Sequence, residues 1–106
     1  MTRSDDQRIA DIIDACGELD AVVALRAAGS TSDLVLVRAA ERLLEIIGEA
    51  ASSVSEDVKN HHPDVDWRSL ARLRNVLAHH YHRTDPNLIW SYATHEAPRL
   101  LSALTT

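Results

Sequence analysis

The chain has few of the residues that cross-link or punctuate a protein: 1 cysteine, 3 glycines, 3 prolines and no phenylalanine among 106 residues. A lone Cys16 excludes an internal disulfide and a cysteine-rich zinc site. So few glycines and prolines disfavour a turn-rich sandwich or barrel, which leaves helices. No apolar run reaches the roughly 20 residues that a membrane-spanning helix needs, and no basic-then-apolar leader opens the chain. We therefore expect a cytoplasmic, all-α protein.

A length of 106 residues supports one core, and we expect a single helical domain over residues 1–106. Residues 4–7, SDDQ, have the form of a capping box, and the apolar spacing after them predicts a helix that ends at Ala28, before Gly29. A second helix is predicted from Asp33. Around residues 52–60 it frays or restarts as a shorter helical piece, which ends before Pro63.

Two further helices are predicted in the second half of the chain. Asp66 has the position of an N-cap for a helix that begins at Trp67, and Asp85 followed by Pro86 starts the last helix. The apolar spacing places Leu88 on the buried side of that helix, and Pro98 is expected to kink it. Four main helices with short joints, together with the short piece, predict an antiparallel helical bundle.

The net charge of −5 hides a separation of charge along the chain. Residues 67–84 contain four arginines, three histidines and no acidic residue, so this segment is +4 with histidine neutral. The other 7 basic and 16 acidic residues leave the rest of the chain at −9. An acidic protein is a poor general binder of nucleic acid, but a local basic strip can steer a polyanion to one place. A solvated basic face that balances acidic neighbours is the alternative. Aromatic residues make up only 4% of the chain, which disfavours an extended base-stacking platform.

Residues 74–81 concentrate the useful chemistry, and they suit phosphodiester cleavage. Arg74 stays protonated, and its planar fork of donors matches phosphate oxygens and stabilises charge on a five-coordinate phosphorus. His79 titrates near neutrality, so it can take a proton from a ribose 2′-hydroxyl or give one to the leaving oxygen. Asn75 lies one helical turn before His79 and can hold its ring in a productive tautomer. Such a scheme requires no metal.

One helix alone does not aim both reactive side chains at a single point. Arg74 and His79 are roughly 140° apart around an ideal helix, whereas Arg74 and Tyr81 share a face. A compact site therefore needs two symmetry-related copies of the helix, or a distortion at its end. Since arginine and histidine often occur five residues apart, the chemistry alone leaves a polar interface pair as the commoner interpretation.

The pattern Arg74-Asn75-x-x-x-His79-x-Tyr81 matches the R-N-x-x-x-H-x-Y signature of the HEPN superfamily, and the chain resembles its HepT-like branch. Residues 42–50, RLLEIIGEA, resemble the second-helix segment of this family, and residues 63–67 resemble its loop into the third helix. The resemblance covers most of residues 33–104 in order.

Four single positions refine this resemblance. Asp85 and Trp90 fall where the family usually has an acidic cap and an aromatic residue. His80 stands where the family often has a small residue, and this larger, titratable side chain can alter access to the cleft or the transfer of protons. Leu73 replaces a common methionine, a change that looks neutral.

The resemblance implies a helical bundle that dimerises and brings two Arg–His motifs together around a cleft. Members of this branch resemble metal-independent endoribonuclease toxins of type VII-like toxin–antitoxin systems. On this resemblance Arg74 and His79 are catalytic, Asn75 supports them, and a nucleotidyltransferase antitoxin adds AMP to Tyr81. The adduct brings bulk and negative charge to a site that must admit RNA phosphate.

The partners implied are a second copy of the chain, the cognate nucleotidyltransferase antitoxin and RNA, with no cofactor, metal or membrane. The other basic residues near the motif are candidates for RNA contact: Arg68, Arg72, His80, His82 and Arg83.

Alternative interpretations remain for the whole chain and for single residues. The same bundle can serve as a non-catalytic module that only docks a nucleotidyltransferase. A third interpretation is that the chain binds a nucleotide without cleaving it, but the sequence contains no glycine-rich phosphate-binding loop. A metal site is also disfavoured, because the histidines do not have the spacing of a metal-binding motif. Asn75 can simply cap or crosslink helices, and Tyr81 can be a half-buried aromatic.

Several residues outside the motif have expected structural roles. We expect Gly48 at a close contact between helices and Glu49 as a buried polar partner of an arginine. Cys16 is expected to be a small core residue. Trp67 and Trp90 are expected to anchor the core or an interface.

Overall fold

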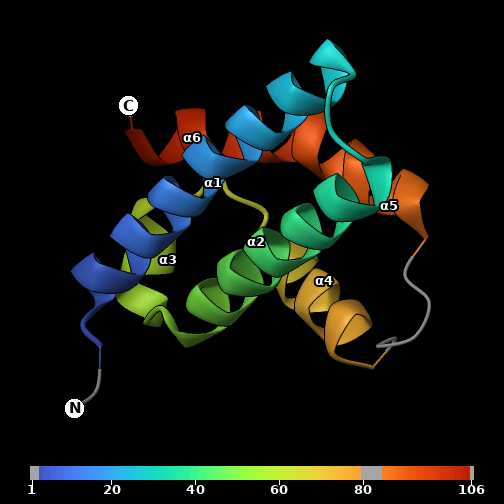
Figure 1. Cartoon of the computed structure of the whole chain (residues 1–106). Helices are drawn as coiled ribbons and strands as arrows, with labels where there is room; N and C mark the ends of the chain where they lie inside the picture. Colours follow the sequence, from blue (N-terminus) through green and yellow to red (C-terminus); the bar gives the residue numbers. More distant parts are fainter. Residues whose placement is uncertain (1–2, 80–84, 106) are drawn as a thin grey trace.

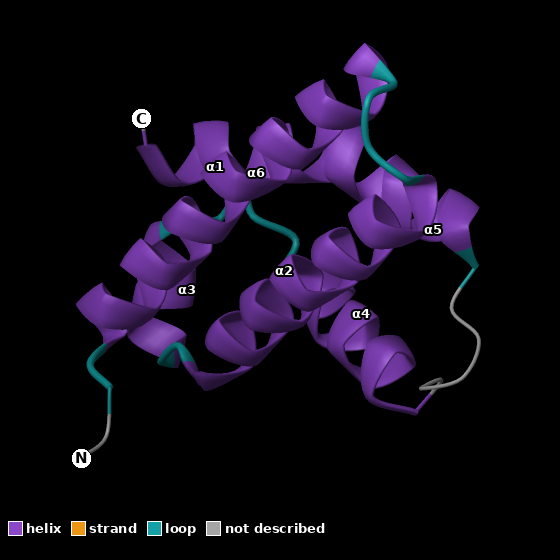
Figure 2. Cartoon of the chain, in the orientation of Figure 1, coloured by secondary structure: helices purple, strands orange, loops and turns teal. Residues whose placement is uncertain are grey.

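The computed structural model describes residues 3–79 and 85–105, and within these ranges all regular structure is helical (Figure 1, Figure 2). The elements in chain order are α1 (Asp5–Ala28), α2 (Asp33–Ser53), α3 (Glu56–His61), α4 (Trp67–His79), α5 (Pro86–Ser91), the π-helical turn η1 (Tyr92–Glu96) and α6 (Ala97–Thr105). Because α5, η1 and α6 follow one another without a break, they form one last helix. Within the described residues, four main helices and the short α3 therefore make up the fold, which confirms the predicted all-α bundle.

The first helix begins and ends where its capping residues predict. Ser4 Oγ accepts a hydrogen bond from the Gln7 backbone N–H at 3.1 Å, and Gln7 Oε1 accepts one from the Ser4 N–H at 2.8 Å. These two bonds complete the capping box. At the other end Gly29 has φ 72°, a left-handed conformation that favours glycine, and its N–H bonds to the carbonyls of Leu25 and Arg26.

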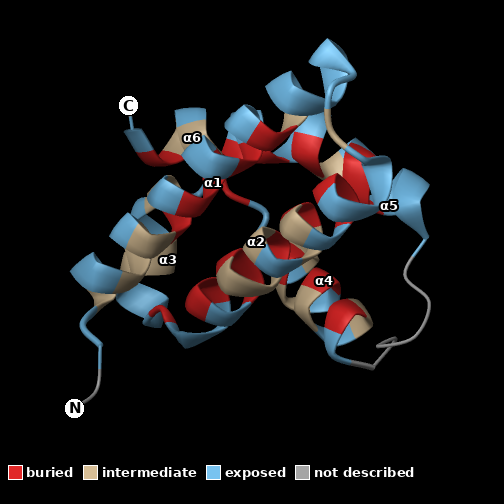
Figure 3. Ribbon diagram, in the orientation of Figure 1, coloured by how far each residue is buried: buried red, intermediate tan, exposed pale blue. Residues whose placement is uncertain are grey.

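The second helix is the central element, because α2 packs against both α1 and α4 (Figure 1). The chain reverses direction at Gly29, so α2 runs back along α1. Many residues of α2 are buried, as the red bands of its ribbon in Figure 3 show. The buried residues of α2 are Leu36, Val37, Ala40, Leu44, Ile47, Gly48, Ala50 and Ala51.

The expected short helical piece is α3, which follows the N-cap Ser55 and ends at His61 before Pro63. The start of α4 is also as predicted. Asp66 Oδ1 accepts a hydrogen bond from the Ser69 backbone N–H at 3.0 Å, which caps the first turn. Trp67 Nε1 then donates to the carbonyl of His62 at 3.2 Å. This bond ties the first residue of α4 back to the loop that follows α3.

The last helix begins at its predicted cap but contains a feature that sequence reasoning did not describe. Asp85 Oδ1 accepts a hydrogen bond from the Asn87 N–H at 2.9 Å, and Pro86 occupies the first helical position. Before Pro98 the helix widens into η1, in which the Ala97 N–H bonds to the Tyr92 carbonyl five residues back. Pro98 follows this π-turn in α6 and has no N–H to continue the ladder, and the kink that we predicted there stays a prediction.

Leu88 does not lie on a buried side, because its exposed fraction is 38%. The prediction was wrong because apolar spacing identifies a face of a helix, not how far neighbouring helices cover it. Leu88 belongs to the short helix α5, which lies at the edge of the bundle (Figure 1).

The core assignments of Cys16 and Trp90 are confirmed. Their exposed fractions are 3% and 8%, and burial raises the pKa of the Cys16 thiol to about 11. Trp67 is half-buried and packs against the edge of the same core. In the part of the chain that the structure describes, no helix is both long and apolar enough to cross a bilayer.

Candidate functional site

Arg74 lies where α4 crosses α2, and a glycine on α2 makes this close crossing possible. A Cβ built on Gly48 would lie 2.8 Å from Arg74 Cβ and 3.2 Å from Arg74 Cα. Neither atom is the far end of a flexible side chain, so any larger residue at position 48 would push the two helices apart. The predicted close contact at Gly48 is therefore confirmed. Its position fixes where the Arg74 side chain leaves the backbone.

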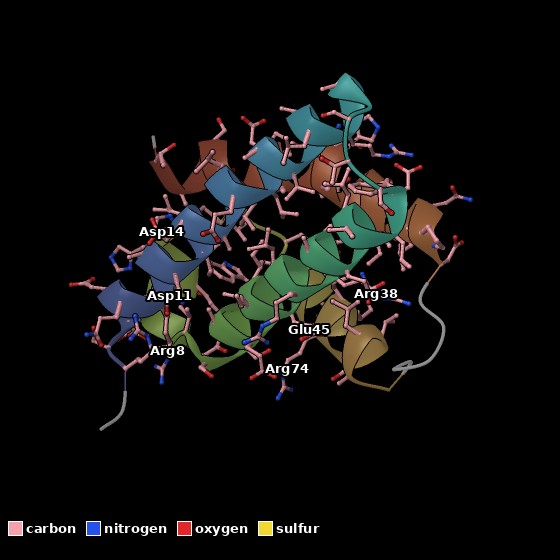
Figure 4. The ribbon with its side chains drawn as sticks, viewed as in Figure 1. Arg8, Asp11, Asp14, Arg38, Glu45 and Arg74 are labelled. Atoms are coloured by element: carbon pink, nitrogen blue, oxygen red, sulfur yellow. The ribbon has the colours of Figure 1, made fainter. Side chains whose placement is uncertain are left out.

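The next residue of α2 holds the Arg74 guanidinium. Arg74 Nε donates a hydrogen bond to Glu49 Oε1 at 3.1 Å, so the two form an ion pair. This contact uses Nε, and the guanidinium has two further nitrogens with four N–H donors. The Arg74 side chain is 42% exposed, so an anion can approach it from solvent. Figure 4 shows Arg74 beneath α2, on the same side of the molecule as Arg38 and Glu45.

Glu49 is the predicted partner of an arginine, but it is not buried. Its side chain is 62% exposed, because it lies on the outer face of α2. In this position the carboxylate orients the guanidinium and partly neutralises it while remaining hydrated. A phosphate that binds Arg74 therefore meets a pre-oriented group that is not locked in the interior.

The remaining motif residues lie on a different face of α4 or outside the described residues. Asn75 is exposed, one residue beyond Arg74. His79 is the last residue of α4, and its side chain lies outside the described residues. The same applies to residues 80–84, which include the predicted AMP acceptor Tyr81 and three RNA-contact candidates: His80, His82 and Arg83.

The helical register of α4 separates Arg74 from the rest of the predicted site. Arg68 and Arg72, both exposed, are followed at helical spacing by Asn75 and His79, so these four positions share one face of α4. Arg74 lies about 100° or more away from that face, toward α2. Along a regular α4, the positions of Arg74 and His79 therefore lie on different faces, and whether a second copy or a distorted helix end completes the site stays a prediction.

Another polar contact of α4 lies away from Arg74. Ser69 Oγ and Tyr92 Oη are 2.6 Å apart, and this hydrogen bond ties the first turns of α4 to η1. Both residues line a cavity of about 290 Å³ between α4 and the last helix. Arg74 does not line it. Among the described side chains, no three His, Cys, Asp or Glu residues gather closely enough to hold a metal ion.

Comparison with known proteins identifies the family. The family model described as "Ribonuclease HepT-like" matches residues 12–106. The chain is 41% identical over 59 residues to "Probable ribonuclease HepT" of Thermococcus cleftensis, which covers 56% of this chain and 54% of that protein. It is 41% identical over 61 residues to "Putative RNase MJ0127" of Methanocaldococcus jannaschii, which covers 58% of this chain and 50% of that protein.

The chain thus spans about half the length of the curated relatives that it matches. No solved structure matches it. The family match extends from the first turns of α1 to the last residue, and it includes both Arg74 and the helix that holds it. On this match, the chain belongs to the HepT-like ribonuclease family of HEPN proteins.

Proposed function

We propose that this protein is a metal-independent endoribonuclease, the toxin of a type VII-like toxin–antitoxin pair. The observation that carries the proposal is the geometry of Arg74 in a HepT-like chain. Glu49 orients its guanidinium through Nε, and the side chain is 42% exposed. The ribonuclease names of the two relatives support the same activity.

In the proposed reaction, two copies of the chain supply one cleft. The ribose 2′-oxygen attacks phosphorus, so a P–O2′ bond forms while the P–O5′ bond breaks. His79 of one copy takes the proton of the 2′-hydroxyl, and the protonated His79 of the other copy gives a proton to the departing 5′-oxygen. Arg74 stabilises the negative charge that gathers on the non-bridging oxygens. The products are a 2′,3′-cyclic phosphate and a 5′-hydroxyl, and Asn75 supports the imidazole.

Regulation in this proposal acts on Tyr81, two residues after His79. The nucleotidyltransferase antitoxin joins AMP from ATP to the phenolic oxygen of Tyr81 and releases pyrophosphate. The new phosphodiester carries a negative charge, so it repels RNA phosphate and fills space beside the motif. Replacement of Tyr81 by phenylalanine removes the acceptor oxygen, and the variant should gain no AMP mass when it is incubated with the antitoxin and ATP.

The decisive experiment measures cleavage of mixed cellular RNA by the purified chain in EDTA. We expect Arg74→Ala to lower the rate by about 10²- to 10³-fold and His79→Ala by about 10²- to 10⁴-fold. The matched control is Arg99→Ala, because Arg99 is an arginine on α6 whose side chain is 79% exposed. This control removes the same charge and should cleave RNA as fast as the parent.

Circular dichroism and thermal unfolding establish that the variants are folded. If the folded alanine variants cleave RNA as fast as the parent, the catalytic assignment is wrong. If the parent itself cleaves nothing while it still binds the nucleotidyltransferase, the chain is a non-catalytic docking module.

A further inference from the structure

A groove of about 560 Å³ lies between α3 and the first turns of α4, and we refer to it as the α3–α4 groove. Its volume is in the range of sites that hold a small organic ligand. Arg74 does not line it, so it is separate from the contact between Arg74 and Glu49. The lining residues that can bind a ligand through polar or aromatic groups are Lys59, Asn60, Trp67 and Arg68.

Trp67 offers the groove an aromatic surface whose position is fixed. Its Nε1 donates to the carbonyl of His62, and the ring packs against the edge of the core. The residue is only half-buried, however, and it also lines the α3–α4 groove. Two other described aromatics differ, because Trp90 is 8% exposed and Tyr92 Oη is hydrogen-bonded to Ser69 Oγ. A base that stacks on Trp67 would therefore meet a ring that is already in place.

The charged side chains of the groove favour an anion. Lys59, Arg68 and the single lining carboxylate, that of Glu56, sum to +1 in a chain whose net charge is −5. Glu56 pairs with Lys59 at 3.7 Å, but the Glu56 side chain is 85% exposed, so water screens this pair. Arg68 is exposed, and its planar fork of N–H donors matches two oxygens of a phosphate.

Asn60 adds a group that can bind the edge of a base. It is exposed on the last turn of α3, and its amide carries both a donor and an acceptor. Proteins recognise single-stranded RNA by stacking bases on aromatic rings, by hydrogen bonds to the base edges and by basic groups at the phosphates. The groove holds one ring, one amide and two basic side chains, so it fits one nucleotide and not an extended stacking platform.

The groove lies at the start of the face of α4 that carries part of the predicted site. On that face Arg72 follows Arg68 by one turn, and the positions of Asn75 and His79 continue at helical spacing. From Arg68 to His79 a helix rises by roughly 17 Å, which is farther than one nucleotide reaches. A single strand can occupy the groove and the rest of this face together, whereas a free nucleotide would occupy only the groove.

We propose that the α3–α4 groove is a subsite for one unpaired nucleotide of the RNA strand, at a distance from the bond that is cut. Trp67 stacks on the base, Asn60 bonds to its edge, and Arg68 binds the neighbouring phosphate. Lys59 adds positive charge beside them. The subsite gives the protein a preference for RNA in which that nucleotide is not base-paired. This proposal rests on the proposed function, because its ligand is the RNA that the function cuts.

An RNA that cannot be cleaved tests the subsite by binding alone. The probe is a fluorescein-labelled octanucleotide of mixed sequence in which every 2′-hydroxyl is methylated, and fluorescence anisotropy measures its binding to the full chain. We expect Trp67→Leu to raise the dissociation constant by about 5- to 150-fold, because the stacking of one base contributes a factor of this size. Trp67→Phe is the matched control. Both variants lose the Nε1 bond to His62, but phenylalanine keeps a ring, so its dissociation constant should stay within about 3-fold of the parent value.

Arg68→Ala tests the phosphate contact without disturbing the ring. The loss of one contact should lower the slope of log affinity against log salt by about 0.7. Arg99→Ala on α6 removes the same charge and should keep the slope of the parent, because Arg99 lies outside the groove. Asn60→Ala should reduce the spread of affinities among probes that carry a single kind of base. Free AMP should compete at least about 100-fold more weakly than the probe, because it cannot reach the phosphate contacts farther along α4.

The proposal is overturned if folded Trp67→Leu and Trp67→Phe bind the probe equally, if Arg68→Ala keeps the salt slope of the parent, or if AMP competes as well as the probe. Circular dichroism establishes folding, and if Trp67→Leu does not fold, the salt slope of Arg68→Ala decides. RNA cleavage by the parent separates this proposal from the proposed function. A parent that binds the probe through the groove but cleaves no RNA contradicts only the function. A parent that cleaves RNA, with groove variants that bind like it, contradicts only the subsite.

Discussion

The two faces of α2 have opposite characters on one helix. On the inner face Ala40, Leu44 and Ile47 are 0%, 0% and 1% exposed and belong to the core, and α2 itself packs against both α1 and α4. On the outer face Arg42 and Glu49 are 70% and 62% exposed. Burial of apolar surface gives the inner face its contribution to folding, whereas hydrated charges add little stability. The outer face is therefore free to carry recognition, so substitutions on the two faces should affect different measurements.

The largest effect is expected from the inner face. Leu44→Ala removes a fully buried side chain and leaves a cavity, so the free energy of unfolding should fall by about 2–5 kcal/mol. The matched control is Leu34→Ala on the exposed side of the same helix, which should change it by less than about 0.5 kcal/mol. Urea unfolding of both variants at one protein concentration measures the difference. Equal losses in the two variants would mean that the faces do not differ as described.

Gly48 lies between the two faces of α2, at the crossing with α4. Its replacement should change the free energy of unfolding less than Leu44→Ala does, and the sign of the change shows which of two effects is larger. Alanine gains helix propensity of about 1 kcal/mol over glycine. At position 48, however, the new Cβ meets Arg74 Cβ at 2.8 Å, and overpacking costs about 1–3 kcal/mol. We expect Gly48→Ala to destabilise the protein by about 1 kcal/mol and to slow RNA cleavage, because it displaces Arg74.

Gly17→Ala is the control for Gly48→Ala. Gly17 is exposed within α1, and an added Cβ meets nothing within 4 Å. Only the higher helix propensity of alanine then changes the stability, so this variant should be more stable than the parent by about 1 kcal/mol. Thermal unfolding should move the melting temperatures of the two variants in opposite directions. A stabilising Gly48→Ala would show that α2 and α4 do not approach as closely as 2.8 Å implies.

The sequence predicts best what is decided locally. The boundaries of α1 and of the last helix follow from the Ser4–Gln7 capping box and from Asp85 before Pro86, whose hydrogen bonds lie within three residues. The π-turn before Pro98 was not predicted, because a missing N–H says that a ladder is interrupted and not how the helix accommodates it.

What depends on how helices cross was less predictable. Apolar and polar spacing could assign Glu49 to an arginine, but not to Arg74, because that choice depends on where α4 crosses α2. The burial of Glu49 was predicted wrongly for a related reason, because the spacing of apolar residues along a helix does not show which of its faces other helices cover. The roles of His79 and Tyr81 stay predictions, because the structure does not describe their side chains.

The smallest effect is expected just beyond the C-terminal end of α2, where the backbone of Ser55 contacts the carboxylate of Asp5. The Ser55 N–H donates to Asp5 Oδ1 at 3.1 Å, and hydrogen bonding by Ser55 lowers the pKa of the Asp5 carboxyl below 3.8, with Arg8 adding a smaller contribution. A carboxyl with a lowered pKa in the folded state stabilises the protein above its unfolded pKa, and this contribution is lost as the pH falls through the folded value.

Asp5→Asn should therefore melt slightly below the parent at pH 7, and the two melting temperatures should converge as the pH falls from about 5 to below the ordinary aspartate pKa. Asp6→Asn removes the same charge from the same helical turn but leaves the Ser55 bond in place, so it should show less convergence. If the melting temperatures of Asp5→Asn and the parent differ by the same amount at every pH, the lowered pKa of Asp5 does not contribute to stability. Even when present, the effect should be far smaller than that of Leu44→Ala, because water screens an exposed carboxylate and cannot replace a buried side chain.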